Sequence, residues 1–286
     1  MRAFLPDFEL HAAPSLSAAL TMLAAEPGGW RPFAGGTDLM VLLDAGKLPP
    51  GRYLSLHNLD ELRGIAADGD AISIGALSTY TDVLRSPLLQ AECPLLCRAA
   101  ADTGGVATQN RGTIGGNIAN ASPAADTPPA LLVYDASIDL VSVRGIRRVP
   151  YDRFHLGYKR LDLAPDELIH SVRVRRGRGA WKQAWRKVGT RRAQAISKVS
   201  VAAALDLAGP IVRDVRIAFG SVAPTVLRAA RAEAVLRGRT LGVETIAASA
   251  EALGGDIAPI DDLRSTAGYR RRVAANVLRQ CLAGWV

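Results

Sequence analysis

A short loop with two adjacent glycines offers main-chain groups that could bind a phosphate. It is the stretch Ala34-Gly35-Gly36-Thr37-Asp38, which follows a predicted strand at 30–33 and precedes a predicted helix at 39–43. Glycine lets a ligand approach the main chain closely, and successive N–H groups beside a helix N-terminus attract an anion. The loop lacks the spacing of the G-x-G-x-x-G fingerprint and of a P-loop. These residues alone therefore leave two interpretations open, a pyrophosphate cradle and an ordinary turn.

A second stretch, residues 110–120, is polar, rich in glycine, and uncharged apart from Arg111. It offers backbone amides, hydroxyls and side-chain amides, and an ordered loop of this kind must satisfy its polar groups. A bound ligand would do so, and so would a capped Ω-loop. Asp126 follows, and its carboxylate could accept hydrogen bonds from sugar hydroxyls or cap a helix that begins near Pro128.

Residue types that would support hydrolysis or metal chemistry are absent or scattered. The four histidines show no metal-ligand spacing, and no Ser/His/Asp or Cys/His arrangement is visible. Three cysteines, Cys93, Cys97 and Cys281, are too few for an all-cysteine iron–sulfur cluster, and their odd number argues against a disulfide framework. We therefore expect no catalytic side chain and no metal site, and we expect the cysteines to be small buried residues.

The composition is that of an ordinary globular protein. The chain has 286 residues, of which 49% are hydrophobic and 22% charged, enough for one large or two ordinary domains. No apolar run approaches the roughly 18–20 residues of a membrane span, and the N-terminus lacks the apolar region of a signal peptide. We therefore expect a cytoplasmic protein with no membrane span.

Basic residues exceed acidic ones by 8, and many arginines are clustered. The clusters lie at 144–148, 173–178, 186–192 and 270–272. Such clusters usually form a solvated face, and the alternatives are a surface for an acidic partner or help in holding a phosphate-bearing cofactor. A nucleic-acid-binding module is a further alternative. With only 5% aromatic residues and no recognition motif, however, the sequence favours no nucleic-acid partner.

The hydrophobic pattern predicts an α/β beginning, a glycine-rich middle, and a C-terminal part in which strands precede helices. Helices are predicted from Ser15 to about residue 26 and at 39–43, 79–84, 94–101, 128–134, 225–237, 242–253 and 266–283. Strands are predicted at 30–33, 53–56, 71–74, 137–141, 168–174, 180–188, 198–207 and 214–221. Residues 103–120 are predicted as a loop, and the basic segment 175–179 is a plausible domain boundary.

Together, the two glycine-rich motifs make the sequence similar to a known protein family. The sequence GGTD at 35–38, followed by TIGGNIAN at 113–120, resembles the FAD-binding (medium) subunit of the xanthine dehydrogenase and carbon monoxide dehydrogenase family of molybdenum hydroxylases. The order and separation of the motifs agree with that family, as do Ser122-Pro123 with Asp126, the GYK sequence at 157–159, the PDELI sequence at 165–169 and the basic strand at 187–198. The resemblance covers essentially the whole chain.

The resemblance implies an α+β fold. Its first part would be a two-part FAD-binding domain of the PCMH (vanillyl-alcohol-oxidase-like) type at 1–175, with subdomains of about 1–55 and 56–175. A smaller α+β domain like that of the carbon monoxide dehydrogenase flavoprotein, an antiparallel sheet plus a helix bundle, would follow at 180–286.

The resemblance also implies a set of cofactor-binding residues. They are Pro32, Phe33, Ala34, Gly35, Gly36, Thr37, Asp38, Leu39, Thr103, Thr113, Ile114, Gly115, Gly116, Asn117, Asp126, Ile169 and Lys187. The residues at 32–39 and 113–117 would line the pyrophosphate and flavin, and Asp126 would contact the hydroxyl-bearing part. Ile169 would pack near the isoalloxazine ring with Lys187 close to it. Taken by themselves, Ile169 could equally be a core residue and Lys187 could equally form a surface salt bridge.

The implied function is oxidoreduction within a complex. FAD on this chain would accept electrons from the [2Fe–2S] clusters of a small subunit and pass them to NAD+, a quinone or oxygen. A molybdopterin-binding large subunit would oxidise the substrate, and the assembly would be a dimer of heterotrimers. The alternative is a stand-alone FAD-dependent oxidase or reductase of the same fold, with its own substrate pocket.

Overall fold

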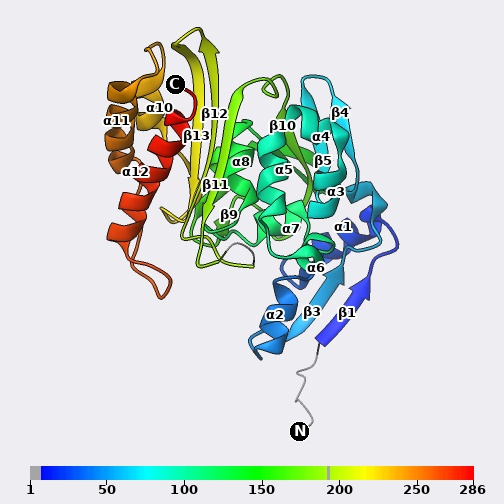
Figure 1. The fold of residues 1–286 in the computed structure, drawn as a ribbon. Coiled ribbons are helices and arrows are strands. Elements are labelled where there is room, and N and C mark those ends of the chain that lie inside the picture. The colour runs from blue at the N-terminus through cyan, green and yellow to red at the C-terminus, as the bar shows by residue number, and fades with distance from the viewer. Residues whose placement is uncertain (1–7, 192–193) are drawn as a thin grey trace.

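The computed structural model describes residues 8–191 and 194–286. Its sheets lie side by side from the N-terminal to the C-terminal end of the chain, and helices α10 to α12 form the outermost layer beside the last sheet (Figure 1). Within the described residues no helix is both long and apolar enough to cross a membrane. The α+β fold that the sequence predicted is confirmed.

The N-terminal unit is a three-stranded parallel sheet in the order β1-β3-β2. Its elements are β1 (Phe8–Ala12), α1 (Leu16–Ala25), β2 (Trp30–Phe33), α2 (Leu39–Asp44) and β3 (Gly51–Ser55). Ser15 begins α1 as predicted, because its side chain accepts a hydrogen bond from the Ala18 amide. Helix α1 buries Ala19, Leu20 and Leu23, whereas α2 buries no residue at all. The apolar sequence of α2 therefore lies on the surface.

The middle unit is a five-stranded sheet in the order β4-β5-β10-β6-β7, with a separate β8–β9 hairpin. Its elements are η1 (Asp60–Leu62), β4 (Ile65–Asp68), β5 (Ala71–Gly75), α3 (Tyr80–Arg85), α4 (Pro87–Glu92), α5 (Pro94–Ala101), α6 (Val106–Gln109), α7 (Ile114–Ala119), α8 (Thr127–Val133), β6 (Ser137–Ser142), β7 (Gly145–Pro150), α9 (Tyr151–Phe154), β8 (His155–Gly157), β9 (Arg160–Leu161) and β10 (Leu168–Arg175). The prediction of a loop over 103–120 was wrong, because α6 and α7 lie there. Thr113 caps α7 by accepting a hydrogen bond from the Gly116 amide.

The C-terminal unit is an antiparallel sheet in the order β11-β12-β13-β14, followed by helices. Its elements are β11 (Lys182–Val188), β12 (Val199–Ala208), β13 (Ile211–Gly220), β14 (Leu227–Arg228), α10 (Ala230–Leu236), α11 (Val243–Ala252), η2 (Leu253–Gly255) and α12 (Ala267–Ala283).

Strand β12 explains how this sheet is covered on both faces. Successive side chains of a strand point to opposite faces. Val201 and Leu205 belong to the core that includes α10 to α12, whereas the intervening Ala202 and Ala204 belong to the core of the middle unit. Because alanine is small, α8 can pack directly against β12 and β13. The sheet is thus shared between two hydrophobic cores.

A network of ion pairs joins the same two units at the end of α8. Asp135, which has a positive φ of 48°, accepts hydrogen bonds from Arg178 at 2.5 Å and from Arg228 at 3.1 Å. The Arg216 guanidinium lies 3.5 Å from the same carboxylate. Arg228 also pairs with the buried Glu233 at 2.6 Å. One carboxylate of the middle unit thus contacts strands β13 and β14 of the C-terminal unit.

Most of the arginine clusters are used within the protein. Arg144, Arg147, Arg148, Arg173, Arg176 and Arg178 each pair with an acidic residue. Arg270 is also buried, and it bonds the Ser221 carbonyl oxygen at 2.7 Å and Asp262 at 2.8 Å. The usual interpretation of these clusters as a solvated face was therefore wrong for Arg270, although Arg271 and Arg272 are exposed. A charge reversal at 270 would test folding rather than partner binding.

We predict that Asp135→Ala lowers the free energy of unfolding by about 2 kcal/mol, because three guanidinium groups lose a shared partner. Asp206→Ala is the matched control. It breaks a pair with the largely exposed Arg213 and should cost less than about 1 kcal/mol. Urea denaturation of both variants measures the difference, and equal losses would show that the Asp135 network has no special role.

Candidate functional site

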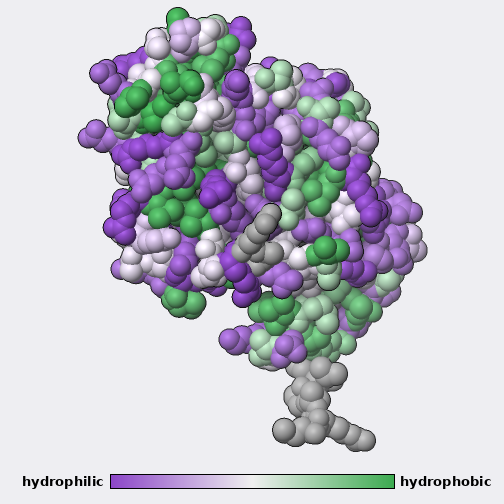
Figure 2. All heavy atoms as spheres, viewed as in Figure 1, coloured by the Kyte–Doolittle hydropathy of each residue, from purple (hydrophilic) through white to green (hydrophobic). Residues whose placement is uncertain are grey.

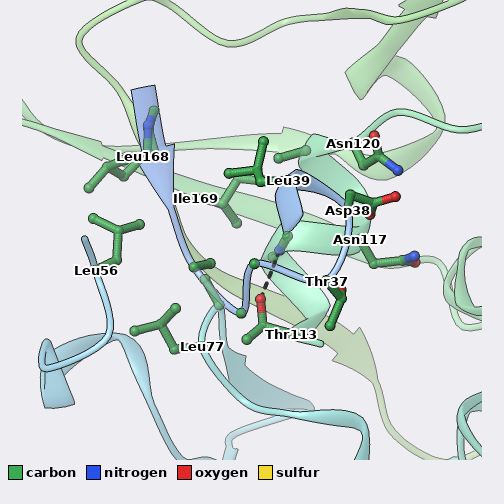
Figure 3. Close-up of a pocket in the computed structure, with 18 of the residues that line it drawn as sticks. Thr37, Asp38, Leu39, Leu56, Leu77, Thr113, Asn117, Asn120, Leu168 and Ile169 are labelled. Carbon is green, nitrogen blue, oxygen red and sulfur yellow. Dashed lines mark hydrogen bonds between the residues drawn. The ribbon is translucent and has the colours of Figure 1, made fainter. Parts of the chain in front are cut away.

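A cavity of about 310 Å³ lies where the N-terminal unit meets the middle sheet. Its walls come from the β2–α2 loop, the start of α7 and the start of β10 (Figure 3). The residues that line it are Pro32, Ala34, Gly35, Gly36, Thr37, Asp38, Leu39, Leu56, Ala76, Leu77, Tyr80, Thr113, Gly115, Gly116, Asn117, Ala119, Asn120, Leu163, Glu167, Leu168 and Ile169. Both glycine-rich motifs of the sequence therefore meet in one cavity.

The two motifs are in direct main-chain contact. A Cβ atom at Gly35 would lie 1.9 Å from the carbonyl oxygen of Arg111 and 3.2 Å from the Cα of Gly112. Gly36 has a φ of +76°, and a Cβ atom there would lie 2.7 Å from the Phe33 ring. Glycine is thus required at both positions, for close approach at Gly35 and for the left-handed backbone at Gly36.

The first loop presents unused donors to the cavity. Among the described residues, none accepts a hydrogen bond from the four main-chain N–H groups of residues 35–38. The Gly36 carbonyl oxygen, in contrast, accepts the Met40 amide at 2.8 Å. Buried or half-buried amides rarely lack a partner. Consecutive free N–H groups at the start of a helix suit an anionic ligand such as a diphosphate.

The second motif contributes in a different way from the first. Its amides are already used: Ile114 donates to the Ser78 carbonyl oxygen at 3.0 Å, and Gly115 donates to the Ala76 carbonyl oxygen at 2.8 Å. A Cβ atom at Gly115 would lie 2.7 Å from Ala76 Cβ, so this glycine allows α7 to pack on the end of β5. The Gly116 and Asn117 amides donate to the Thr113 hydroxyl and carbonyl oxygens. The expectation that this stretch offers free main-chain amides was therefore wrong for residues 114–117.

Side chains of the second motif supply the polar groups instead. Asn117 accepts a hydrogen bond at Oδ1 from the Thr127 hydroxyl at 2.7 Å, which leaves its Nδ2 as a donor. Asn120 accepts one from Lys159 at 2.7 Å. Burial lowers the pKa of Lys159, and the charge of Asp38 offsets part of that effect. Lys159 is therefore a cation near the acidic residue of the first loop.

The opposite wall of the cavity is aliphatic. Leu39, Leu56, Leu77, Leu168 and Ile169 lie around it (Figure 3). Ile169 is only 7% exposed and belongs to the core of the middle unit, so it is both a core residue and part of the cavity wall. A β-bulge interrupts the β10–β6 register between Ile169 and Ser171. Such a bulge changes the direction of side chains next to it.

Five predicted residues do not line this cavity: Phe33, Thr103, Ile114, Asp126 and Lys187. Lys187 donates to Asp126 Oδ2 at 2.7 Å and to the Asp102 carbonyl oxygen at 2.8 Å. The Ser197 hydroxyl donates to Asp126 Oδ1 at 2.7 Å. Burial raises the pKa of the Asp126 carboxyl, while Lys187 and Ser197 offset part of the rise. The pair is buried, so the interpretation of Lys187 as part of a surface salt bridge was wrong.

The structure also shows whether Asp126 caps the helix that follows it. Although this residue stands at the N-cap position of α8, its side chain makes no capping hydrogen bond. Thr103 bonds the Ala99 carbonyl oxygen through its hydroxyl at 2.8 Å and follows Asp102 directly. Asp126, Lys187, Ser197 and the Asp102 carbonyl group thus form one buried polar cluster, which does not include the Thr103 hydroxyl. Thr127, the neighbour of Asp126, connects the cluster to Asn117 in the cavity.

Several cavity residues were missed by sequence reasoning. Tyr80, Leu77 and Ala76 follow β5, and Leu168 precedes the predicted Ile169 on β10. Asn120 is the last residue of the TIGGNIAN motif at 113–120, but it was not among the predicted cofactor-binding residues. The signal that could have found the first three is their position at the end of a strand, where binding residues often gather.

The donor set fits a nucleotide that has a diphosphate and a flat apolar ring. Free amides and small residues lie at one side of the cavity, and aliphatic side chains lie at the other. Within the described residues no group of His, Cys, Asp and Glu could hold a metal ion. The fold and the cavity thus define a class of protein that binds a dinucleotide cofactor between a small parallel unit and a larger sheet.

Comparisons with known proteins give the family. Residues 6–175 match the model of the FAD binding domain in molybdopterin dehydrogenase, and residues 184–284 match the carbon monoxide dehydrogenase flavoprotein C-terminal domain. The chain belongs to the family of FAD-binding subunits of molybdopterin dehydrogenases. The predicted resemblance is thereby confirmed.

The relatives of known function match this chain over nearly its full length. The carbon monoxide dehydrogenase medium chain of Hydrogenophaga pseudoflava is 32% identical over 285 residues, covering 98% of both chains. The xanthine dehydrogenase FAD-binding subunit of Escherichia coli O157:H7 is 31% identical over 275 residues, covering 96% of this chain and 94% of the relative. A solved structure of carbon monoxide dehydrogenase from Hydrogenophaga pseudoflava superposes with a TM-score of 0.93 at 32% identity, covering 98% of this chain and 97% of that one. The chain is thus an oxidoreductase subunit that binds FAD.

We predict that Gly35→Ala strongly lowers FAD occupancy, because the new Cβ would force the first loop away from residues 111 and 112. Gly268→Ala is the control, since a Cβ atom there meets nothing within 4 Å and its position in α12 favours alanine. Flavin absorbance per protein, with circular dichroism to check folding, measures the result. Full occupancy in a folded Gly35→Ala protein would exclude this loop from the site.

Proposed function

We propose that this chain is the electron-relay subunit of a molybdenum hydroxylase, accepting electrons from [2Fe–2S] clusters of a partner and delivering them to an external acceptor such as NAD+, a quinone or oxygen. The observation that carries the proposal is the meeting, in one cavity, of four unused main-chain donors at 35–38 and an aliphatic wall. When bound, FAD supplies the chemistry that exchanges electron pairs and single electrons. The chain's own residues bind and orient it.

Within this proposal the residues have distinct tasks. The main chain at 35–38 holds the diphosphate, and Asn117 adds a side-chain donor. Ile169 and its aliphatic neighbours exclude water from one face of the ring. The buried Asp126–Lys187 pair fixes β11 of the C-terminal unit beside α8, and Thr127, the neighbour of Asp126, holds Asn117 in the cavity. We also propose the domain division at 1–175 and 180–286.

The proposed partners follow from the relatives. One solved relative is described as a carbon monoxide dehydrogenase that lacks the Mo-pyranopterin moiety of its molybdenum cofactor, and another as a Cu,Mo-CO dehydrogenase. Because the described residues show no catalytic arrangement, substrate oxidation fits a molybdopterin-binding large subunit. A small [2Fe–2S] subunit would complete a heterotrimer, which we propose is dimeric and cytoplasmic.

The surface beside the cavity suits a subunit contact. Met40 and Val41 on α2 are 52% and 66% exposed, and Leu10 on β1 is 63% exposed. Apolar residues gather over α2 (Figure 2). Exposed apolar side chains that gather in one place often mark an interface. A redox partner docked here would lie close to the cofactor, as electron transfer requires.

We predict that Val41→Asp reduces co-purification of the iron–sulfur subunit, because a charge would be buried against the partner. Val243→Asp is the matched control, since this valine is also exposed but lies at the start of α11, away from the cavity (Figure 1). Affinity purification of the tagged chain from its native cells measures both variants. Equal recovery of the subunit in both would remove α2 from the interface.

The relay itself is tested by co-purification and flavin reduction. Purified protein should carry an oxidised-flavin spectrum, two further chains should co-purify, and substrate of the complex should bleach the flavin only when those chains are present. A stand-alone oxidase or reductase would instead purify alone and be reduced directly by its own substrate. That result would replace the relay with the alternative function.

A further inference from the structure

Among the buried tyrosines, one hydroxyl is open to the cavity and has no protein partner. Tyr80 is 3% exposed and lines the cavity, and its hydroxyl makes no hydrogen bond to any described residue. It is also not among the fully enclosed polar atoms, which include the hydroxyl of Tyr151. Tyr134, by contrast, donates to Gln183 at 2.6 Å and accepts the Leu95 amide at 3.0 Å.

The position of Tyr80 places it at the junction of the two motifs. Its amide donates to the Gly112 carbonyl oxygen at 3.2 Å. Its ring packs so closely on Gly112 that a Cβ atom there would lie 2.7 Å from Cε2. Gly112 is also the residue whose Cα lies beside Gly35. Tyr80 therefore packs against Gly112, which itself contacts Gly35 in the loop that carries the free amides of residues 35–38.

The electrostatic surroundings keep this hydroxyl a neutral donor. Burial raises the pKa of Tyr80 far above its ordinary value, and the negative charges of Asp126 and Asp38 raise it further. A buried phenol next to carboxylates does not ionise, so it can donate to an anionic oxygen without repelling it.

We propose that the Tyr80 hydroxyl donates a hydrogen bond to a diphosphate oxygen of FAD and so determines the affinity of this chain for the cofactor. The inference rests on the proposed placement of FAD in this cavity. A donor whose ring is fixed by Gly112 and which has no competing protein acceptor is preorganised for a ligand. Hydrogen bonds to charged groups are the stronger ones, so losing it should weaken binding by roughly tenfold to a hundredfold.

The test compares Tyr80→Phe with Tyr151→Phe in the full chain freed of flavin. Each variant removes one buried hydroxyl that has no partner among the described residues, but only Tyr80 lines the cavity. Titration with FAD should show the tenfold to hundredfold loss for Tyr80→Phe and no change for Tyr151→Phe. Riboflavin, which has no phosphate, should bind Tyr80→Phe and the unaltered chain equally well.

The experiments distinguish a failure of the Tyr80 inference from a failure of the proposed placement of FAD. Unchanged FAD affinity in Tyr80→Phe would overturn the inference, and so would an equal loss for riboflavin, because the contact would then involve the ring or its ribityl chain. Unimpaired FAD binding by a folded Gly35→Ala protein would overturn the placement itself. Circular dichroism of each variant checks that the fold is retained.

Discussion

The main chain of Gly35 touches the main chain of residues 111 and 112, and the site depends on that contact. No side chain other than hydrogen fits between them, since even a Cβ atom would lie 1.9 Å from the Arg111 carbonyl oxygen. The contact brings a loop of the N-terminal unit against the motif that begins α7. Through this contact the loop that carries the free amides of residues 35–38 lines the same cavity as the aliphatic residues of β10.

The C-terminal unit is fixed to this site by packing and by charge. Alanines of β12 let the sheet approach α8, and the buried Lys187–Asp126 pair joins β11 to the start of the same helix. Asp135 joins the end of α8 to β13 and β14. Separating a buried ion pair leaves an uncompensated charge and costs several kcal/mol. Helix α8 is thus held at both ends, so a displacement of the C-terminal sheet would also move Thr127, which donates a hydrogen bond to Asn117 in the cavity.

Local patterns in the sequence were sufficient for most of the longer strands and helices, since alternation in β12 and capping by Ser15 are properties of neighbouring residues. They were not sufficient for α6 and α7, which lie in the stretch predicted as a loop. The convergence of the two glycine motifs was expected from a family resemblance rather than from physics. What local reasoning could not give depends on tertiary contacts. The apolar pattern of α2 is that of a buried helix, yet none of its residues is fully buried in the part of the chain that the structure describes. Residues near Asp126 could not reveal that its partner is Lys187, which lies on a strand of another unit.

The charges around the cavity explain why neutral donors matter so much. Of the described residues that line it, none is a lysine or arginine, and two, Asp38 and Glu167, are acidic. Glu167 is neutralised by Arg147 at 2.6 Å, and most other arginines of the neighbouring clusters have carboxylate partners of their own. In the proposed placement of FAD, binding of the diphosphate therefore comes mainly from oriented N–H and O–H dipoles, which are effective because they are already fixed in place. Lys159, near Asp38, adds the nearby positive charge. Such a site binds an anion without an excess of positive charge, because the donors are held in position by main-chain contacts.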